Sequence, residues 1–331
     1  MNYNLNSWYG QLQAYVASQG IRTYGRIFVV VPQADANYQM YSDIFRNDSE
    51  GNVRLFTDIA TAYAATTSDR NDVILLSANA THSLTTTLLI ANNRVHFVWM
   101  DWWDRLVQQG TKIELAWNVA VDSVAYVTWT RCTFTNIKFI QSSTNAASLY
   151  TIKDAAEWSK YKNCSAIFWV VNNLGWTTAH EFLAWNDSAT FIDCTFWCDT
   201  LLTSWARSVF HIKTLTTEFK SNQMRWCTFI ISSSSWTATF IRLNAVTDIL
   251  FTNIFRDCDF IASVDSAWWA AIAEAVQTWT WTNKWTLNFS NCGFFNCTKV
   301  STATSGRNTA IQVCWPVPTA LSSIGILPAA A

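Results

Sequence analysis

The chain has 331 residues, of which half are hydrophobic and 14% are charged, and its formal net charge is −1. No basic stripe supports nucleic-acid binding, and no apolar stretch approaches the length of a membrane span. The first ten residues lack the basic and apolar regions of a signal peptide, so none is expected. Nine cysteines at long intervals do not resemble a compact disulfide framework.

Residues 1–50 are predicted to form a cap or docking segment. Within 4–19, apolar residues recur at helical spacing: Leu5, Trp8, Leu12 and Val16. Gly20 supplies a stop signal for this helix. A short apolar strand follows over 27–31, and residues 33–54 are polar and rich in turn formers. The helix over 4–19 either docks the protein on a particle or folds against its own body.

A second short helix is predicted from Thr57, as its N-cap, to about Thr66. Three apolar strands are predicted after it: 73–76, 88–90 and 95–98. We expect these strands to form the first coil of a solenoid, with the helix laid across its open end. Such a cap covers the apolar core and protects the strand edges from pairing with other chains.

From about residue 111 to 315 the sequence repeats with a period of about 30–34 residues. Six cysteines mark the period, in settings such as Asp-Cys-Thr-Phe: Cys132, Cys164, Cys194, Cys227, Cys258 and Cys292. Each unit also carries an apolar strand, at 148–152, 209–212, 239–243, 271–275 and 309–313. The pattern predicts an all-β, right-handed parallel β-helix over 51–315, with short N-terminal capping helices. The remaining 316–331 would be a tail.

Alternation along the cysteine strand predicts that Cys258 and Phe260 point inward, whereas Asp257 and Asp259 point outward. Equivalent positions of successive coils should stack into one column: Arg131, Asn163, Asp193, Trp226, Asp257 and Asn291. The cysteines are interpreted as buried free thiols, one per coil. The cysteine pairs 194/198 and 292/297 have no histidine nearby, so no metal site and no cofactor are predicted.

The tryptophan content is anomalous. There are 20 tryptophans and only 9 glycines, and many of the tryptophans stand where a turn favours glycine, as at 102–103, 268–269 and 279–281. The number of tryptophans and glycines taken together is normal for a chain of this length, so only the division between the two residue types is unusual. We hypothesise that many of these codons specify glycine in the source organism. The alternative is a genuinely aromatic surface suited to sugar stacking.

The segment from Thr57 to Asp101 resembles the opening of the pectin-lyase-like right-handed parallel β-helix superfamily. It combines a capping helix with two strands, Asn-Asp-Val-Ile-Leu-Leu and Val-His-Phe-Val-Trp-Met-Asp. The family usually has glycine where Trp99 stands here. The whole chain is also similar to uncharacterised β-helix proteins of uncultured tailed bacteriophages, and this resemblance implies a virion component.

Superfamily members that act on polysaccharides use carboxylates on the helix face, since glycoside hydrolysis needs two such groups at set distances. Their motifs are missing here. The remaining catalytic candidates are Asp193, Asp257 and Asp259, for which a solvated polar ladder is the simpler interpretation. His180 and Glu181 are predicted in a turn-like surface stretch, and the strand histidines are predicted to be structural: His82, His96 and His211.

The sequence therefore predicts a structural protein of a bacteriophage virion, such as a tailspike, fibre or capsid-associated protein, made in the host cytoplasm. Its expected partners are other virion proteins or copies of itself, with a homotrimer weighed against a monomer, and cell-surface polysaccharide. Neither nucleic acid nor membrane is expected to bind. One alternative is a polysaccharide lyase or glycoside hydrolase acting in a groove on the β-helix, and another is an adhesin without turnover.

Overall fold

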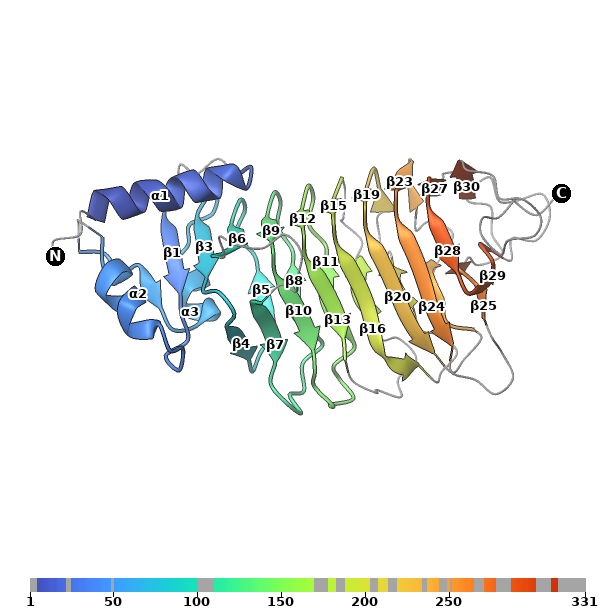
Figure 1. Ribbon diagram of the computed structural model, residues 1–331, viewed down its shortest axis with the longest axis horizontal. Coiled ribbons are helices and arrows are strands. Elements are labelled where there is room, and N and C mark those ends of the chain that lie inside the picture. Colours follow the sequence, from blue (N-terminus) through green and yellow to red (C-terminus); the bar gives the residue numbers. More distant parts are fainter. Residues whose placement is uncertain are drawn as a thin grey trace.

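A computed structural model of the chain forms a rod of stacked coils, with the helices gathered at the N-terminal end (Figure 1). The structure describes residues 5–21, 25–48, 51–100, 110–169, 178–182, 188–202, 208–213, 219–233, 237–243, 249–250, 252–264, 271–277, 287–301 and 311–314. The predicted right-handed parallel β-helix is confirmed. Each coil contributes one strand, or rung, to each of three parallel sheets.

Sheet A is the longest of the three. In spatial order its described strands are β2 (Leu55–Phe56), β1 (Ile27–Val30), β3 (Val73–Leu76), β6 (His96–Trp99), β9 (Thr133–Thr135), β12 (Lys160–Lys162), β15 (Thr190–Ile192), β19 (Gln223–Arg225), β23 (Asn253–Arg256), β27 (Leu287–Ser290) and β30 (Ile311–Cys314). The segment predicted at 309–313 as the last copy of the apolar strand of each unit belongs instead to this sheet, through β30, which pairs with β27.

Sheet B contains the strands that follow sheet A within each coil: β4 (Thr81–Leu84), β7 (Lys112–Leu115), β10 (Lys138–Gln141), β13 (Ser165–Phe168), β16 (Thr195–Leu202), β20 (Thr228–Ser233), β24 (Asp259–Val264) and β28 (Gly293–Phe295). Sheet C completes the coil: β5 (Leu88–Ile90), β8 (Ser123–Val127), β11 (Tyr150–Asp154), β14 (Thr178–Phe182), β17 (Ser208–Ile212), β21 (Thr239–Leu243) and β26 (Val276–Gln277). Two short pairs lie outside these sheets: β18 (Phe219–Lys220) with β22 (Ile249–Leu250), and β25 (Ile272–Glu274) with β29 (Cys297–Lys299).

Left-handed residues bound the short strands of sheet A. The entry turns, before these strands, have φ between 54° and 62° at Asn71, Arg94, Arg131, Trp158, Ser188 and Ser221. The exit turns, between sheets A and B, have φ between 48° and 60° at Asn136, Asn163, Asp193, Trp226, Asp257 and Asn291. Asparagine and aspartate tolerate this conformation better than other non-glycine residues. The polar column predicted from the sequence is therefore a column of turns.

The sequence prediction was wrong at Arg131 in this polar column and at Cys132 in the column of cysteines. Arg131 and Cys132 lie at the entry turn, and Asn136 and Ile137 occupy the exit-turn positions of their coil. The true cysteine column begins one coil later and follows the exit turns: Cys164, Cys194, Cys227, Cys258 and Cys292. The Arg131 and Asn136 turns are only five residues apart, so spacing alone could not separate them.

The N-terminal helices cover two different surfaces. Helix α3 (Ile59–Ala64) packs Ile59 and Ala62 into the main core, as the predicted cap should, but its N-cap is Asp58 rather than Thr57. Helix α1 (Leu5–Ser18) instead packs Leu12 and Val16 against the outward side chains of β1, β3 and β6. The helix thus folds against the body, as one of the two predicted roles requires, while docking on a particle stays a prediction.

Two details of the first coil also differ from the sequence prediction. Helix α2 (Tyr38–Phe45) lies within the stretch predicted to be polar turns. The first coil runs through β3, β4 and β5, while β6 starts the next rung of sheet A.

Among the described residues no helix is long and apolar enough to cross a membrane.

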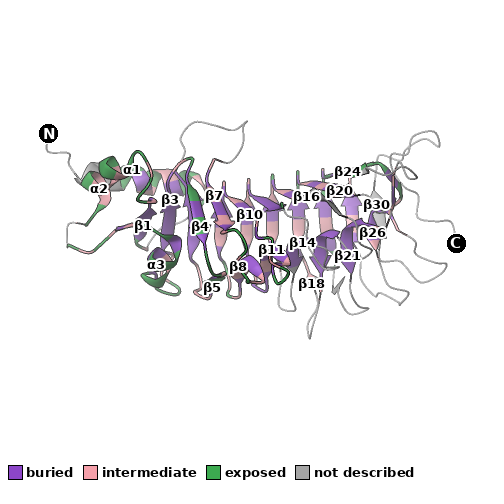
Figure 2. Cartoon of the chain, turned by 90° about the horizontal axis from the view of Figure 1, so that it is seen from below, coloured by how far each residue is buried: buried purple, intermediate pink, exposed green. Residues whose placement is uncertain are grey.

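The strands of all three sheets carry buried residues along the rod (Figure 2), and stacked aromatic rings fill much of the core. From sheet A, Tyr161 lies between Phe134 and Phe191 at ring-centroid distances of 4.9 and 4.7 Å. From sheet B, Phe229 stacks on Phe196 and Phe260 at 4.9 and 4.6 Å. Because in-register rungs lie about 4.8 Å apart, identical inward residues of neighbouring coils meet face to face.

Trp226 is the sharpest test of the tryptophan anomaly. It occupies an exit turn at φ 55° and is 57% exposed, so it combines backbone strain with little burial. We expect Trp226→Gly to raise the unfolding free energy by roughly 1 kcal/mol, because glycine removes the left-handed penalty. Trp99→Gly, in strand β6 and 4% exposed, should instead lose about 3 kcal/mol or more.

Urea denaturation of both variants measures this difference, and a Trp226→Gly variant less stable than the parent would contradict it. Mass spectrometry of the protein from its natural source tests the coding hypothesis directly. Glycine at position 226 is the expected result, and tryptophan there would overturn the hypothesis.

Candidate functional site

The predicted carboxylates do not share one strand face. Asp193 and Asp257 lie in exit turns, whereas Asp259 is the first residue of β24. The coil of Trp226 separates Asp193 from Asp257. Asp257 and Asp259 were predicted to point the same way because they are two residues apart, but the left-handed turn at Asp257 breaks that alternation.

The surroundings of these carboxylates are those of a solvated turn. Asn291 Nδ2 donates to Asp257 Oδ1 at 2.6 Å, continuing the amide ladder in which Asn163 donates to Asn136. Partial burial, then the neighbouring Cys258, raises the pKa of Asp259. Its carboxylate lies beside Gly293, where an added Cβ would come within 2.8 Å of Oδ1.

A denser set of ionisable groups lies on the outer side of sheet C. Lys153, Glu181, His211 and Arg242 occupy directly paired positions on β11, β14, β17 and β21. We call these four residues the sheet C ladder. Sequence reasoning placed His180 and Glu181 in a surface turn, which is wrong, because both belong to β14. Three further aspartates of the sequence, Asp101, Asp104 and Asp187, lie outside the described residues.

A usable signal for the ladder was present in the sequence. The segments Thr-Ala-His-Glu-Phe, Ser-Val-Phe-His-Ile and Thr-Phe-Ile-Arg-Leu have the same length, and each begins with a hydroxyl residue and ends with a large apolar residue. Aligned as repeats, they place Glu181, His211 and Arg242 at one position. All three strand histidines are buried, but only His211 occupies a position of the sheet C ladder, since His82 lies in β4 and His96 in β6.

Glu181 is the centre of the sheet C ladder. Its Oε1 lies 3.5 Å from His211 Nδ1 and 4.0 Å from Lys213 Nζ, and the Tyr150 hydroxyl hydrogen bonds to its carboxylate. Burial raises the pKa of Glu181 to about 7, against the opposing effects of Lys153 and Lys213. Burial also lowers the pKa of His211 to about 3, helped by Arg242 and Lys213.

This arrangement places a carboxyl group that titrates near neutral pH among fixed cations. Lys153 is held by Asp122 and lies over the rings of Tyr126 and Tyr150 at 5.1 and 5.4 Å. A group with a pKa near the working pH is suited to accept and return a proton, and neighbouring cations stabilise developing negative charge. The sheet C ladder is therefore the candidate acid–base site.

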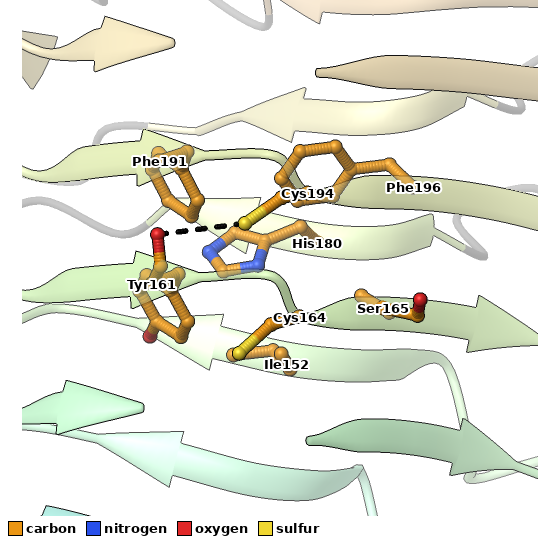
Figure 3. A pocket seen from close by; sticks show the side chains of 9 residues that line it. Ile152, Tyr161, Cys164, Ser165, His180, Phe191, Cys194 and Phe196 are labelled. Atoms are coloured by element: carbon orange, nitrogen blue, oxygen red, sulfur yellow. Dashed lines mark hydrogen bonds between the residues drawn. The ribbon is translucent and has the colours of Figure 1, made fainter. Parts of the chain in front are cut away.

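A second polar cluster lies inside the coil. Asp154 accepts hydrogen bonds from Ser159 Oγ at 2.8 Å and Tyr161 Oη at 2.9 Å, and His180 Nε2 lies 3.8 Å away. The adjoining cavity has a volume of about 10 Å³. Figure 3 shows His180, which lines it, between the thiols of Cys164 and Cys194. That volume is close to one water molecule, so the cavity is a packing feature of the core.

The thiols behave as core side chains. Cys194 Sγ donates to the carbonyl of Ile192 at 3.3 Å, and Cys258 Sγ donates to that of Arg256 at the same distance. Burial raises the pKa of Cys132 to about 12 and raises that of Cys227 as well, so these thiols stay protonated. Within the described ranges no group of three or more His, Cys, Asp or Glu residues is arranged to hold a metal ion.

Comparison with known proteins identifies no family and no curated relative of this chain. No protein-family profile matches the chain, and no curated protein sequence matches it. Solved structures that share the fold include a pectin methylesterase variant bound to a hexasaccharide, with 12% identity and a TM-score of 0.45 over 81% of this chain and 79% of that one.

Another is the pectin methylesterase PemA from Erwinia chrysanthemi, with 14% identity and a TM-score of 0.43 over 87% of this chain and 69% of that one. The parallel β-helix itself is established by the strand pairing described above, while the resemblance to the pectin-lyase-like superfamily stays a prediction. The resemblance to bacteriophage proteins stays a prediction.

The raised pKa of Glu181 predicts a pH-dependent contribution to stability. The folded protein holds this proton up to about pH 7, whereas an unfolded glutamate releases it near its ordinary value of 4.5. Stability from this group is therefore present below pH 4.5 and lost as the pH rises to 7. Relative to the parent, Glu181→Gln should gain on the order of 2–3 kcal/mol at pH 8 and little at pH 4.5.

Unfolding free energies at the two pH values test this prediction. His82, His96 and His180, whose pKa values are lowered by burial, contribute the opposite slope below pH 6.5 in both proteins and cancel in the difference. An equal effect of the substitution at both pH values would contradict the raised pKa.

Proposed function

We propose that this protein is a structural rod of a bacteriophage virion that also contacts surface polysaccharide. The observation that carries the proposal is the continuous solenoid, which α3 closes at one end and whose three sheets present flat outer faces. A rod of this kind spans distance and offers a repeating surface to an extended polymer. The sequence resemblance to phage β-helix proteins supports the same role.

The positions of the predicted carboxylates favour a non-catalytic rod. Asp193, Asp257 and Asp259 are distributed over two turns and one strand start, with Asn291 already bonded to Asp257. Glycoside hydrolysis needs two carboxyl groups facing each other across the bond that is cleaved. These three residues fit a polar edge of the rod better than such a pair.

Analysis of purified particles tests the structural role. We expect the chain to copurify with capsid, portal or tail proteins in stoichiometric amounts and to be labelled by antibody on intact particles. Recovery only as a free protein, absent from particles, would overturn the proposal. Light scattering on the full chain then decides between a monomer and a closed trimer.

A second function, an acid–base enzyme acting on a polysaccharide, is favoured by Glu181. Its pKa of about 7 and the surrounding Lys153, His211 and Arg242 suit proton transfer at neutral pH. Glu181 is only 1% exposed, and this burial is the reason that the enzymatic function stands second. Fold likeness adds nothing here, because one fold hosts many activities.

A panel of neutral and acidic glycans tests the enzymatic function. If a glycan is turned over, Glu181→Gln should lower the rate by about 100-fold or more, as expected when a general acid or base is lost. Full activity in a folded Glu181→Gln variant would exclude this site. Loss of activity only in the Asp257→Asn, Asp259→Asn double variant would return the site to the exit turns.

A further inference from the structure

The outer face of sheet A carries an excess of positive charge that lies apart from the sheet C ladder. Over β12, β15, β19, β23 and β27 the inward positions are filled by core residues such as Tyr161, Met224 and Phe255. The outward positions are Lys160, Lys162, Thr190, Ile192, Gln223, Arg225, Ile254, Arg256, Asn288 and Ser290. Four of these ten are cations and none is acidic. We call these ten residues the cationic face.

Pairing between rungs brings the cations into line along the rod. Lys162 pairs with Ile192, which pairs with Arg225, and Arg225 pairs directly with Arg256. Neighbouring rungs lie about 4.8 Å apart, so the charges repeat along the axis at one or two rung spacings. Arg225 and Arg256 are exposed, while Lys160 and Lys162 are half-buried along their stems.

Within the described part of the chain, no carboxylate lies within ion-pair distance of these four cations. Arg225 Nη2 donates to Gln223 Oε1 at 2.9 Å, which fixes its direction without neutralising it. Glu157 lies three residues before Lys160, and Asp193 and Asp257 lie in exit turns at the edge of the face, where Asp257 accepts a hydrogen bond from Asn291. In a protein of net charge −1, this is a local concentration of unneutralised cations.

The cationic face lies beyond the part of sheet A that helix α1 covers. Helix α1 lies along the N-terminal part of the rod and packs on the apolar outward residues of β1, β3 and β6, including Val29, Leu75 and Val98 (Figure 1). From β12 to β27 eight of the ten outward residues are polar or charged, the exceptions being Ile192 and Ile254. Helix α1 therefore covers the outer face of sheet A at its N-terminal end, whereas the outer face from β12 to β27 is mostly polar or charged.

We propose that the cationic face binds an acidic polysaccharide laid along the rod axis. This inference deepens the proposed function, since it rests on the rod contacting a polysaccharide and names the class and the face. Lysine and arginine attract carboxylate or sulfate groups, and arginine can hold them with two hydrogen bonds. Thr190, Gln223, Asn288 and Ser290 supply the hydroxyl and amide groups that sugar hydroxyls require.

The composition of the face disfavours nucleic acid. Binding of single strands relies on aromatic stacking, and none of the ten outward residues is aromatic. Binding of a duplex relies on a strongly basic surface, whereas this chain has no net positive charge. Two isoleucines among hydroxyl and amide groups fit a sugar polymer, which presents both apolar C–H faces and polar edges.

Binding of sodium alginate to the full chain tests the proposal, with neutral dextran and a duplex DNA as comparison ligands. In the variant Arg225→Glu, Arg256→Glu, affinity for alginate should fall about thirtyfold or more, by analogy with the attraction of cations to other anionic surfaces. The control variant, Lys112→Glu, Lys138→Glu, makes the same charge change at a directly paired couple on sheet B and should change affinity less than threefold.

If the arginine double variant does not fold, Lys160→Gln with Lys162→Gln tests the same face with a smaller expected loss. Equal weakening by the control variant, equal binding of dextran, no binding of alginate, or tighter binding of DNA would each overturn the assignment. The measurement uses purified protein and does not depend on where the rod is displayed. Its failure is therefore distinguishable from failure of the virion proposal.

Discussion

The left-handed turns at the ends of the sheet A strands, which lie on both sides of β9, β12, β15 and β19, are the constraint on which the rest of the structure depends. They turn the chain within one or two residues, so that three-residue strands can alternate strictly between core and solvent. Because successive coils turn at equivalent positions, they stay in register over the length of the rod. The aromatic stacks, the thiol column, the sheet C ladder and the cationic face are all consequences of that register.

Repetition made the architecture predictable from sequence, while the identity of each column was not. A period marked by cysteine and phenylalanine indicates stacked coils whatever the details of the turns. However, Asn136 and Arg131 lie five residues apart in turns of the same conformation, and only the pairing of strands shows which belongs with Asn163. The same ambiguity misplaced Cys132 and put Asp257 on the face of Asp259. A single left-handed residue interrupts the alternation of inward and outward side chains between one strand and the next. The sequence pattern does not reveal where such a residue lies.

The missed ladder has a different cause. Glu181 and His211 are buried on the outer side of sheet C, so their strands read as short apolar runs with polar interruptions. A polar residue in such a run suggests a turn when one segment is considered alone. Only comparison of β14, β17 and β21 shows that the interruption recurs at one position. In a solenoid, information about a residue lies in its neighbours one period away rather than in its flanking sequence.

Charge is separated between the faces of the rod in a way that bears on function. On sheet C, Glu181 is buried near Lys153, Lys213 and Arg242, so opposite charges partly compensate one another although burial still raises the pKa of Glu181. On sheet A the cations are left without such compensation within the described residues. Buried, mutually compensated charges stabilise one geometry, whereas exposed like charges cost free energy through repulsion unless a ligand neutralises them. A structural rod needs only the first arrangement. The second persists at a cost to stability, and binding of an anionic polymer is the interaction that would offset that cost.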